Sequence, residues 1–179
     1  NFSIPSNKLI EFENIEQSSY ANRYKIGEPL NMVFLYEFDG IDPETGLFRV
    51  RDMNFDGSID INDQIIPQNL GRKYFGGLNN QINYQNFSLG FLFEFVKQQG
   101  PRVYNNVPGF LGNIFEKDSD VWTSNNTGAQ VQRSSQSINA LISFLNANAS
   151  TYGITDASYV RLRTLSLGYN LPDETPKNL

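Results

Sequence analysis

An acidic segment has the residue types and the spacing of a calcium-binding loop. Counted from Asp52, oxygen-bearing side chains stand at loop positions 1, 3, 5, 9 and 12, with Gly57 at position 6. Calcium takes about six to eight oxygen ligands, and the glycine permits the sharp turn between the first of them. Residue 7 of such a loop contributes its backbone carbonyl. The predicted metal ligands are Asp52, Asn54, Asp56, Ser58, Asp60 and Asp63.

The loop departs from a signalling EF-hand in two respects. Asp63 stands where an EF-hand has a bidentate Glu, and the alternation before Asp52 indicates a strand where an EF-hand has a helix. Aspartate at position 12 is more similar to the loops of dockerin-type modules. We therefore expect structural Ca²⁺, and the alternatives are an acidic turn that fits by chance and a loop that no longer holds metal.

The residue types that are missing exclude most catalytic centres. The chain has no Cys and no His, so it has no thiol nucleophile, imidazole base, disulfide or Cys/His zinc site. Asp118 and Asp120 beside Trp122 could be drawn as a glycosidase pair, but the local pattern favours solvated acids in a polar loop. We therefore expect a protein that is not an enzyme. Trp122 and Tyr104 are candidates for stacking on sugar rings. The alternative, which is more common for aromatic side chains in a loop, is that they form the small hydrophobic core of the loop itself.

Charge and composition narrow the class of protein further. The formal charge is -5, and the 14 basic residues are spread along the chain, which argues against nucleic acid as a partner. No apolar run approaches the roughly 20 residues of a spanning helix, and residues 1–5 do not resemble a signal peptide. The chain does not begin with Met, so we expect a processed or excised piece of a larger protein.

The elements that must position these residues are mostly strands. Apolar residues alternate with polar ones from Leu30 to Phe38, and a short strand is expected at 47–51, just before the acidic loop. A hairpin is predicted at 74–97, with a turn at Gln85 and Asn86. Strands of about 9–11 residues suit a membrane barrel, whereas strands of soluble sheets are typically about 5–6 residues long.

The remainder of the chain is predicted to be a long loop followed by one strand. Residues 98–155 lack alternation, and a short helix is expected where apolar residues recur at helical spacing after Ser134, Ser135 and Ser137; these are Ile138, Leu141, Ile142 and Leu145. In the strand at 158–171 the apolar residues fall at even positions before Arg163 and Thr164 and at odd positions after them. A bulge at this point would place both sets on one continuous face. Arg161 and Arg163 then suit either a barrel lumen or a solvated face.

Ordered sequence blocks resemble the SusC/RagA-type TonB-dependent outer-membrane transporters of Bacteroidetes. The similarity covers nearly the whole chain. Phe55 replaces the glycine that is usual in the family's acidic loop. The matching blocks are Tyr24–Leu30, Tyr36–Gly46, Asp52–Asp60, Lys73–Asn79, Asn86–Phe95, Trp122–Thr123 and Asp156–Pro172.

This resemblance implies a barrel of about 22 strands in the outer membrane with an N-terminal plug. It implies uptake of oligosaccharides or peptides, powered by TonB and assisted by a SusD-like surface lipoprotein that acts as a lid. Residues 1–179 would be a late, C-terminal part of the barrel, with lipid against its wall and 98–155 as an extracellular loop. The plug, the TonB-contacting segment and the final strands have no counterpart in these residues.

A second interpretation, in which the protein is not a membrane protein, explains the same alternation of apolar and polar residues. A secreted, soluble carbohydrate-binding β-sandwich with structural calcium would also combine an acidic loop with aromatic platforms. A sandwich must cover the apolar residues of 87–95 with a second sheet, whereas a barrel exposes them to lipid. The predicted fold class is therefore all-β and antiparallel, as a fragment of a transmembrane barrel with long extracellular loops and a short loop helix.

Overall fold

The computed structural model describes residues 1–102, 106–110 and 120–171. Its described part consists mostly of antiparallel strands with one α-helix, and it divides into two compact units. The first unit contains Asn1–Ser6, Arg72–Gln98 and residues 157–171, and the second contains Asn7–Gly71 and Gln99–Asp156. Among the described residues, no helix combines the length and the apolar character needed to cross a membrane.

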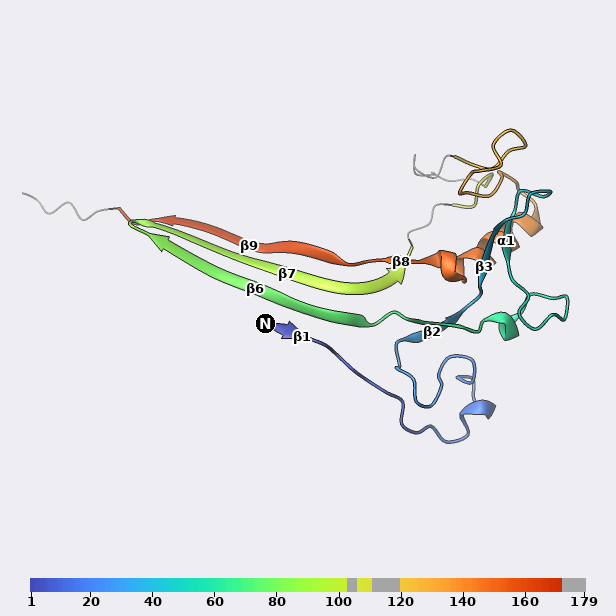
Figure 1. Cartoon of the computed structure of the whole chain (residues 1–179), viewed down its shortest axis with the longest axis horizontal. Helices are drawn as coiled ribbons and strands as arrows, with labels where there is room; N and C mark the ends of the chain where they lie inside the picture. The colour runs from blue at the N-terminus through green and yellow to red at the C-terminus, as the bar shows by residue number, and fades with distance from the viewer. Residues whose placement is uncertain (103–105, 111–119, 172–179) are drawn as a thin grey trace, which may run out of the picture. The chain divides into compact units, whose positions relative to one another are not determined.

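The first unit is a sheet of long antiparallel strands (Figure 1). β6 (Arg72–Tyr84) and β7 (Phe87–Pro101) form the predicted hairpin, and Gln85 in the turn has a positive φ of 51°. β9 (Tyr159–Tyr169) pairs with β7 from Phe87 to Val96, and β1 (Phe2–Ser3) pairs with β6 at Gly76 and Phe75. The hairpin, its turn and the strand at the C-terminal end are confirmed.

The second unit is built from two segments that are distant in sequence. β2 (Met32–Leu35) pairs with β5 (Ile66–Asn69), and β3 (Phe38–Ile41) pairs with β4 (Phe48–Val50). β8 (Ile154–Asp156) pairs with the last residues of β7. Among its described residues the unit also contains short 3-10 helices, namely η1 (Ile15–Gln17), η2 (Ile61–Asp63) and η4 (Thr151–Gly153).

The single strand predicted from Leu30 to Phe38 is wrong, because the structure divides it between two sheets. Tyr36 lies at the break, where its N–H donates to Ala149 and its carbonyl accepts from Thr151. These bonds anchor the segment to the chain after the helix, so the strand cannot continue with one partner. The short strand predicted at 47–51 is confirmed as β4.

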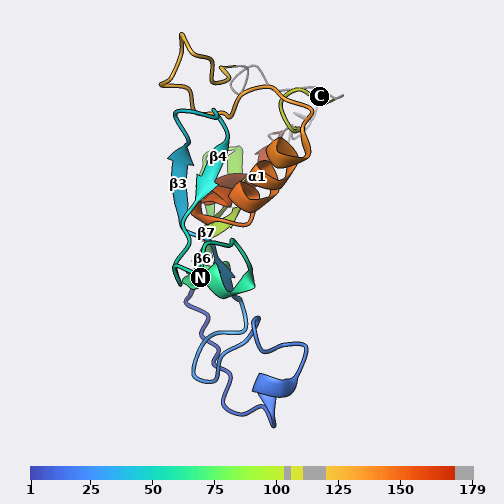
Figure 2. The ribbon, with the colours of Figure 1, turned by 90° about the vertical axis from the view of Figure 1, so that its right-hand side faces the viewer.

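The helix α1 (Ile138–Asn148) packs against β4 (Figure 2). The Ser137 hydroxyl caps it by accepting the Ala140 N–H at 3.2 Å, as the serines before it suggested. Its buried face differs from the predicted one. Ala140, Phe144 and Ala147 are buried, whereas Ile138 is 64% exposed, because the alanines allow close approach to β4. The core of the unit comprises Phe48, Phe144 and Ala147, flanked by Phe38, Ile41, Val107 and Tyr152.

Candidate functional site

One face of the long sheet is mostly apolar, with Asn80 of β6 as a polar position opposite Phe91. Side chains on this face lie opposite one another across β6, β7 and β9, as in the row formed by Leu78, Phe93 and Leu162. The register between β7 and β9 shifts between Leu92 and Phe93, so that Arg163 is the extra residue. The predicted bulge is confirmed, and its effect is the one expected: Leu165 and Leu167 share a face with Leu162 despite their different parity.

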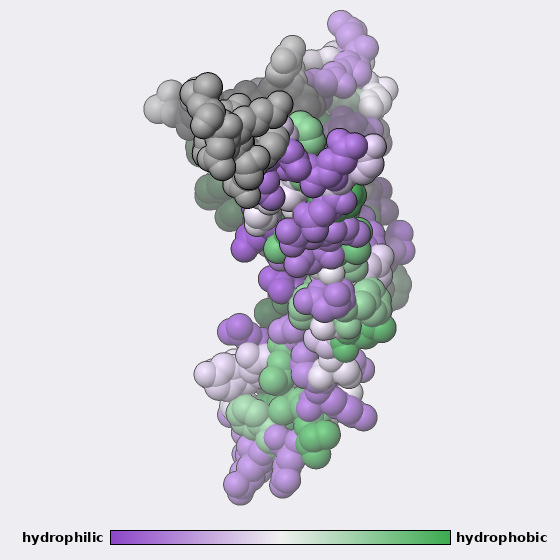
Figure 3. All heavy atoms as spheres, turned by 90° about the vertical axis from the view of Figure 1, so that its left-hand side faces the viewer, coloured by the Kyte–Doolittle hydropathy of each residue, from purple (hydrophilic) through white to green (hydrophobic). Residues whose placement is uncertain are grey.

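Apolar side chains on this face are exposed. Leu167 is 75% exposed, Leu165 is 65% exposed and Val160 is 74% exposed. Figure 3 shows apolar residues at the molecular surface alongside polar ones. Contiguous exposed apolar surface of this kind marks contact with lipid or with another protein.

Aromatic rings gather at both ends of the apolar face. Phe2 lies 5.7 Å from Tyr74 and 6.2 Å from Phe95, measured between ring centroids, at the end where β1 pairs with β6. At the hairpin turn, Phe87 lies 4.7 Å from Tyr169. Between these two clusters lie aliphatic side chains such as Leu78, Leu89 and Leu165, together with the rings of Phe91 and Phe93.

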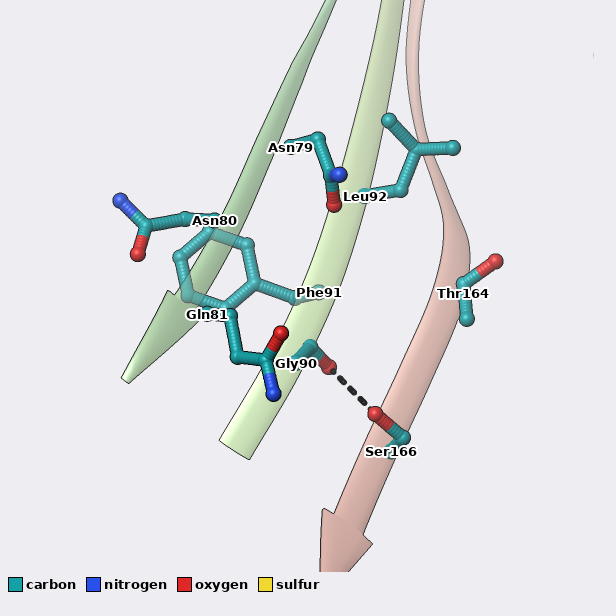
Figure 4. A pocket seen from close by; sticks show the side chains of 8 residues that line it. All are labelled: Asn79, Asn80, Gln81, Gly90, Phe91, Leu92, Thr164 and Ser166. Atoms are coloured by element: carbon teal, nitrogen blue, oxygen red, sulfur yellow. Dashed lines mark hydrogen bonds between the residues drawn. The ribbon is translucent and has the colours of Figure 1, made fainter. Parts of the chain in front are cut away.

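The opposite face of the sheet is polar and contains a shallow hollow of about 300 Å³ (Figure 4). Its lining groups include the amides of Asn79 and Gln81 and the hydroxyls of Thr164 and Ser166, with no charged residue among those that line it. A Cβ on Gly90 would come within 2.6 Å of the Ser166 Oγ, so glycine keeps this place open. The hollow can donate and accept hydrogen bonds with an uncharged polar molecule.

Charged residues of the polar face lie toward one end of it. Arg163 Nε lies 3.5 Å from Glu94 Oε2, and the Arg161 guanidinium stacks over the Tyr159 ring at 4.8 Å. Both predicted arginines therefore have partners within the sheet. The contact of Arg163 with Glu94 places the bulged residue on the polar side.

The acidic loop folds around its own backbone. The Asp52 carboxylate accepts the N–H groups of Phe55 at 2.7 Å and Gly57 at 2.8 Å. Asn54 accepts the Asp56 N–H at 3.0 Å, and Asp56 accepts the Ser58 N–H at 2.8 Å. Hydrogen bonds of this kind, from backbone N–H groups to nearby side-chain oxygens, hold the loop in a tight turn.

Asp63 closes the loop from a fully buried position. Its carboxylate accepts the Met53 N–H at 2.7 Å and the Asp60 N–H at 3.0 Å, so it ties the first turn of the loop to the last. These backbone donors, that of Asp60 foremost, lower the pKa of Asp63 below its ordinary value of 3.8. Asp60 in turn caps η2 by accepting the Asn62 N–H at 2.8 Å.

The donor set of the loop fits a hard cation, because every predicted ligand offers oxygen. Within the part of the chain that the structure describes, no group of three or more His, Cys, Asp or Glu side chains is placed to hold a metal ion. A calcium ion would therefore need the Asn54 amide oxygen and the Ser58 carbonyl as well as carboxylates. Calcium binding remains a prediction.

Trp122 is placed by a contact that the sequence did not reveal. The backbone N–H of Trp122 donates to the Val131 carbonyl at 2.8 Å. The half-buried indole lies on Gly46, where a Cβ would come within 2.2 Å of the indole Cε3. Asp120 accepts the Asn126 amide at 2.5 Å. Tyr104 and Asp118 lie outside the described residues.

Sequence and structure comparisons relate the chain to known proteins. No family model matches it. TonB-dependent receptor P3 of Formosa agariphila is 27% identical over 168 residues, covering 82% of this chain and 16% of the receptor. TonB-dependent receptor P26 of the same organism is 29% identical over 138 residues, covering 73% of this chain and 13% of that receptor.

The fold agrees with these sequence relatives. A chain of the solved RagAB peptide transporter superposes with a TM-score of 0.58 at 20% identity, covering 87% of this chain and 18% of that one. The names of the relatives are those of receptors and transporters, which is consistent with the expectation that the chain is not an enzyme. The resemblance indicated by the ordered sequence blocks is confirmed: the chain is similar in sequence to part of two TonB-dependent receptors and in fold to part of a RagAB chain.

Proposed function

We propose that the long sheet is a stretch of the membrane wall of a TonB-dependent outer-membrane transporter. The observation that supports this most directly is the exposed apolar face with aromatic rings at both ends. Tyr74 and Tyr84 are ten residue steps apart on β6. At about 3.3 Å per residue and a tilt of about 40°, they are separated by about 25 Å along the membrane normal, which is the height of the apolar band in such barrels.

The remaining features of the transporter are inferred from the resemblance to this family. The complete protein would form a barrel of about 22 strands with a plug, and the acidic loop and residues 98–155 would be extracellular, where the loops of such barrels are long. Uptake would depend on TonB and on a SusD-like surface lipoprotein that covers the mouth. The solved RagAB structure is that of a peptide transporter. The uncharged hollow on the polar face suits the amides of a peptide and the hydroxyls of an oligosaccharide alike.

Calcium in the acidic loop belongs to the same proposal. A bound ion would neutralise part of the negative charge of the four aspartates in the segment from Asp52 to Asp63. Titration of Ca²⁺ by calorimetry should show one site that Asp56→Ala weakens at least tenfold. Ser3→Ala, in the other unit, serves as the matched control and should bind as the wild type does. Equal binding by the wild type and Asp56→Ala would remove calcium from the proposal.

Two substitutions in the full-length protein test the wall. Leu165 lies near the middle of the apolar face, and its neighbour Thr164 lies on the polar face. Arginine in mid-membrane costs about 2–4 kcal/mol when it faces lipid and far less when it faces a lumen. Leu165→Arg should therefore strongly reduce the folded protein in the outer-membrane fraction, and Thr164→Arg should not. Equal levels of the two variants, in a protein that stays folded without detergent, would favour the carbohydrate-binding sandwich.

A further inference from the structure

Charge is distributed unevenly between the two units. The described residues of the first unit contain five Lys and Arg side chains and one carboxylate, that of Glu94, so their side chains carry a net charge of +4. The whole chain, in contrast, has a formal charge of -5. A local excess of positive charge raises the concentration of anionic molecules near that surface. The five cations are Arg72, Lys73, Lys97, Arg161 and Arg163.

Three of these cations belong to the polar face of the sheet. Arg161 stands opposite Glu94 across β9 and β7, and Arg163 is the bulged residue that contacts Glu94. Arg72 is paired with Gln98, which alternation along β7 places on the same face as Glu94. Arg72, Arg161 and Arg163 are called the arginine cluster here. The cluster thus combines three guanidinium groups with one carboxylate.

Aromatic rings position two of the guanidinium groups without neutralising them. Arg72 Cζ lies 5.2 Å from the centroid of the Phe75 ring. Arg161 Cζ lies 4.8 Å from that of Tyr159. The two rings belong to one row, on either side of Val96, so their Cα atoms are about 10 Å apart at a strand spacing of about 4.8 Å. Within the described residues, neither of these arginines pairs with a carboxylate. A guanidinium that stacks on a ring keeps its N–H groups available for a planar carboxylate.

The third guanidinium is only weakly neutralised. Arg163 Nε lies 3.5 Å from Glu94 Oε2, and the Arg163 side chain is 53% exposed. Ion pairs with this degree of exposure contribute little, so an incoming anion can compete with Glu94 for Arg163. An anionic ligand would therefore meet two guanidinium groups without a carboxylate partner and a third that it can recruit.

The uncharged hollow of Figure 4 lies on the same face and continues from this cluster. The next row beyond Glu94 is centred on Leu92 and the one after it on Gly90, and both residues line the hollow. The six residue steps along β7 from Val96 to Gly90 correspond to about 20 Å. An oligomer of several units lying along β7 can therefore contact the arginines at one end and the amides and hydroxyls of the hollow at the other.

We infer that the arginine cluster binds a carboxylate of an oligomeric substrate whose neutral units lie in the uncharged hollow. The inference rests on the proposed function, because it takes the polar face to line the lumen of the barrel. Guanidinium groups form bidentate hydrogen bonds with carboxylates, which distinguishes an acidic oligomer from its neutral counterpart. The carboxylate can come from a uronic acid unit of an oligosaccharide or from an acidic side chain of a peptide.

The test measures binding to the full-length transporter in nonionic detergent by calorimetry. The probes are an oligogalacturonate and its methyl ester, and a peptide of alternating Glu and Ser and the same peptide with Gln in place of Glu. One of the two acidic probes should bind more tightly than its neutral counterpart, and which one does identifies the source of the carboxylate. Arg161→Gln should weaken that acidic probe about tenfold and leave its neutral counterpart unchanged.

A variant with the opposite expected sign separates a binding role from a structural one. Glu94→Gln removes the competing carboxylate, so it should tighten the acidic probe about two- to fivefold. Lys8→Gln is the matched control, because it removes one positive charge from an exposed position in the other unit, and it should bind as the wild type does.

The outcomes distinguish this inference from the function on which it rests. Equal binding of the acidic and neutral forms of both probes would overturn the inference. An equal loss in Arg161→Gln and Lys8→Gln, or weaker binding in Glu94→Gln, would overturn it as well. Failure of the Leu165 and Thr164 comparison would overturn both proposals, whereas success there without any preference for acidic probes would overturn only this one.

Discussion

Replacing Gly46 by alanine should destabilise the second unit through two separate effects. Gly46 has a positive φ of 67°, a conformation that a side chain disfavours. A Cβ there would also lie 2.2 Å from Cε3 and 2.7 Å from Cδ2 of Trp122. The Gly46 carbonyl accepts the Arg133 N–H at 2.8 Å, so the backbone is held from the far segment and cannot withdraw freely.

The magnitude can be worked out from a matched glycine. Gly40 has a φ of 85°, but a Cβ there would meet nothing within 4 Å. Gly40→Ala should therefore cost only the left-handed backbone penalty, about 1–2 kcal/mol. Gly46→Ala adds overpacking against the indole, about 1–3 kcal/mol, for a total of about 2–5 kcal/mol.

The assay is direct because Trp122 is the chain's single tryptophan. Urea unfolding of the detergent-solubilised chain, followed by Trp122 fluorescence, reports the contact and the stability together. Gly46→Ala should lower the midpoint more than Gly40→Ala and shift the native emission, because the ring must move.

The comparison of the two glycine variants can contradict the packing of Trp122 on Gly46. If Gly46→Ala and Gly40→Ala lower the free energy of unfolding equally, Trp122 does not pack on Gly46. The variant that combines Gly46→Ala with Trp122→Ala should show a smaller cost than the sum of its single changes, because the clash has gone; this is followed by circular dichroism.

Three further predictions concern single sites in the second unit. Gln132→Ala should cost about 2–4 kcal/mol in urea unfolding, because it leaves the buried Phe48 N–H without its acceptor and removes the amide that donates to the Ala140 carbonyl; a loss below about 1 kcal/mol would contradict these buried bonds. Phe55→Gly should instead stabilise the chain by about 1 kcal/mol, since it relieves a φ of 60° at an exposed side chain, and a destabilised variant would contradict this. The pKa of Asp63 is lowered first by the Asp60 N–H and then by that of Met53, so its contribution to stability is complete above about pH 4 and is lost as the pH falls through the folded-state pKa. The protection of the Met53 amide from hydrogen exchange, relative to an unfolded chain at the same pH, should therefore fall only below that range, and a loss of protection at about pH 6 would oppose the assignment.

Elements whose signal is local could be predicted from the sequence. Alternation over ten residues and a two-residue turn specify the hairpin of β6 and β7, because strand period and turn chemistry depend on near neighbours. The parity change at Arg163 predicted the bulge for the same reason. The serines before Ile138 marked the start of α1, and the acidic loop was recognisable from spacing alone.

Tertiary structure decided the features that depend on partners distant in the chain. Whether residues 30–38 form one strand or two was settled by hydrogen bonds from Tyr36 to residues more than a hundred positions away. The buried face of α1 depends on its packing against β4. Ala140 and Phe144 are buried, whereas the larger apolar side chain of Ile138 is exposed. Gln132, whose amide accepts the Phe48 N–H and donates to the Ala140 carbonyl, has no local signal at all. Periodicity reports which side chains share a face, but only the packed neighbours determine which face is covered.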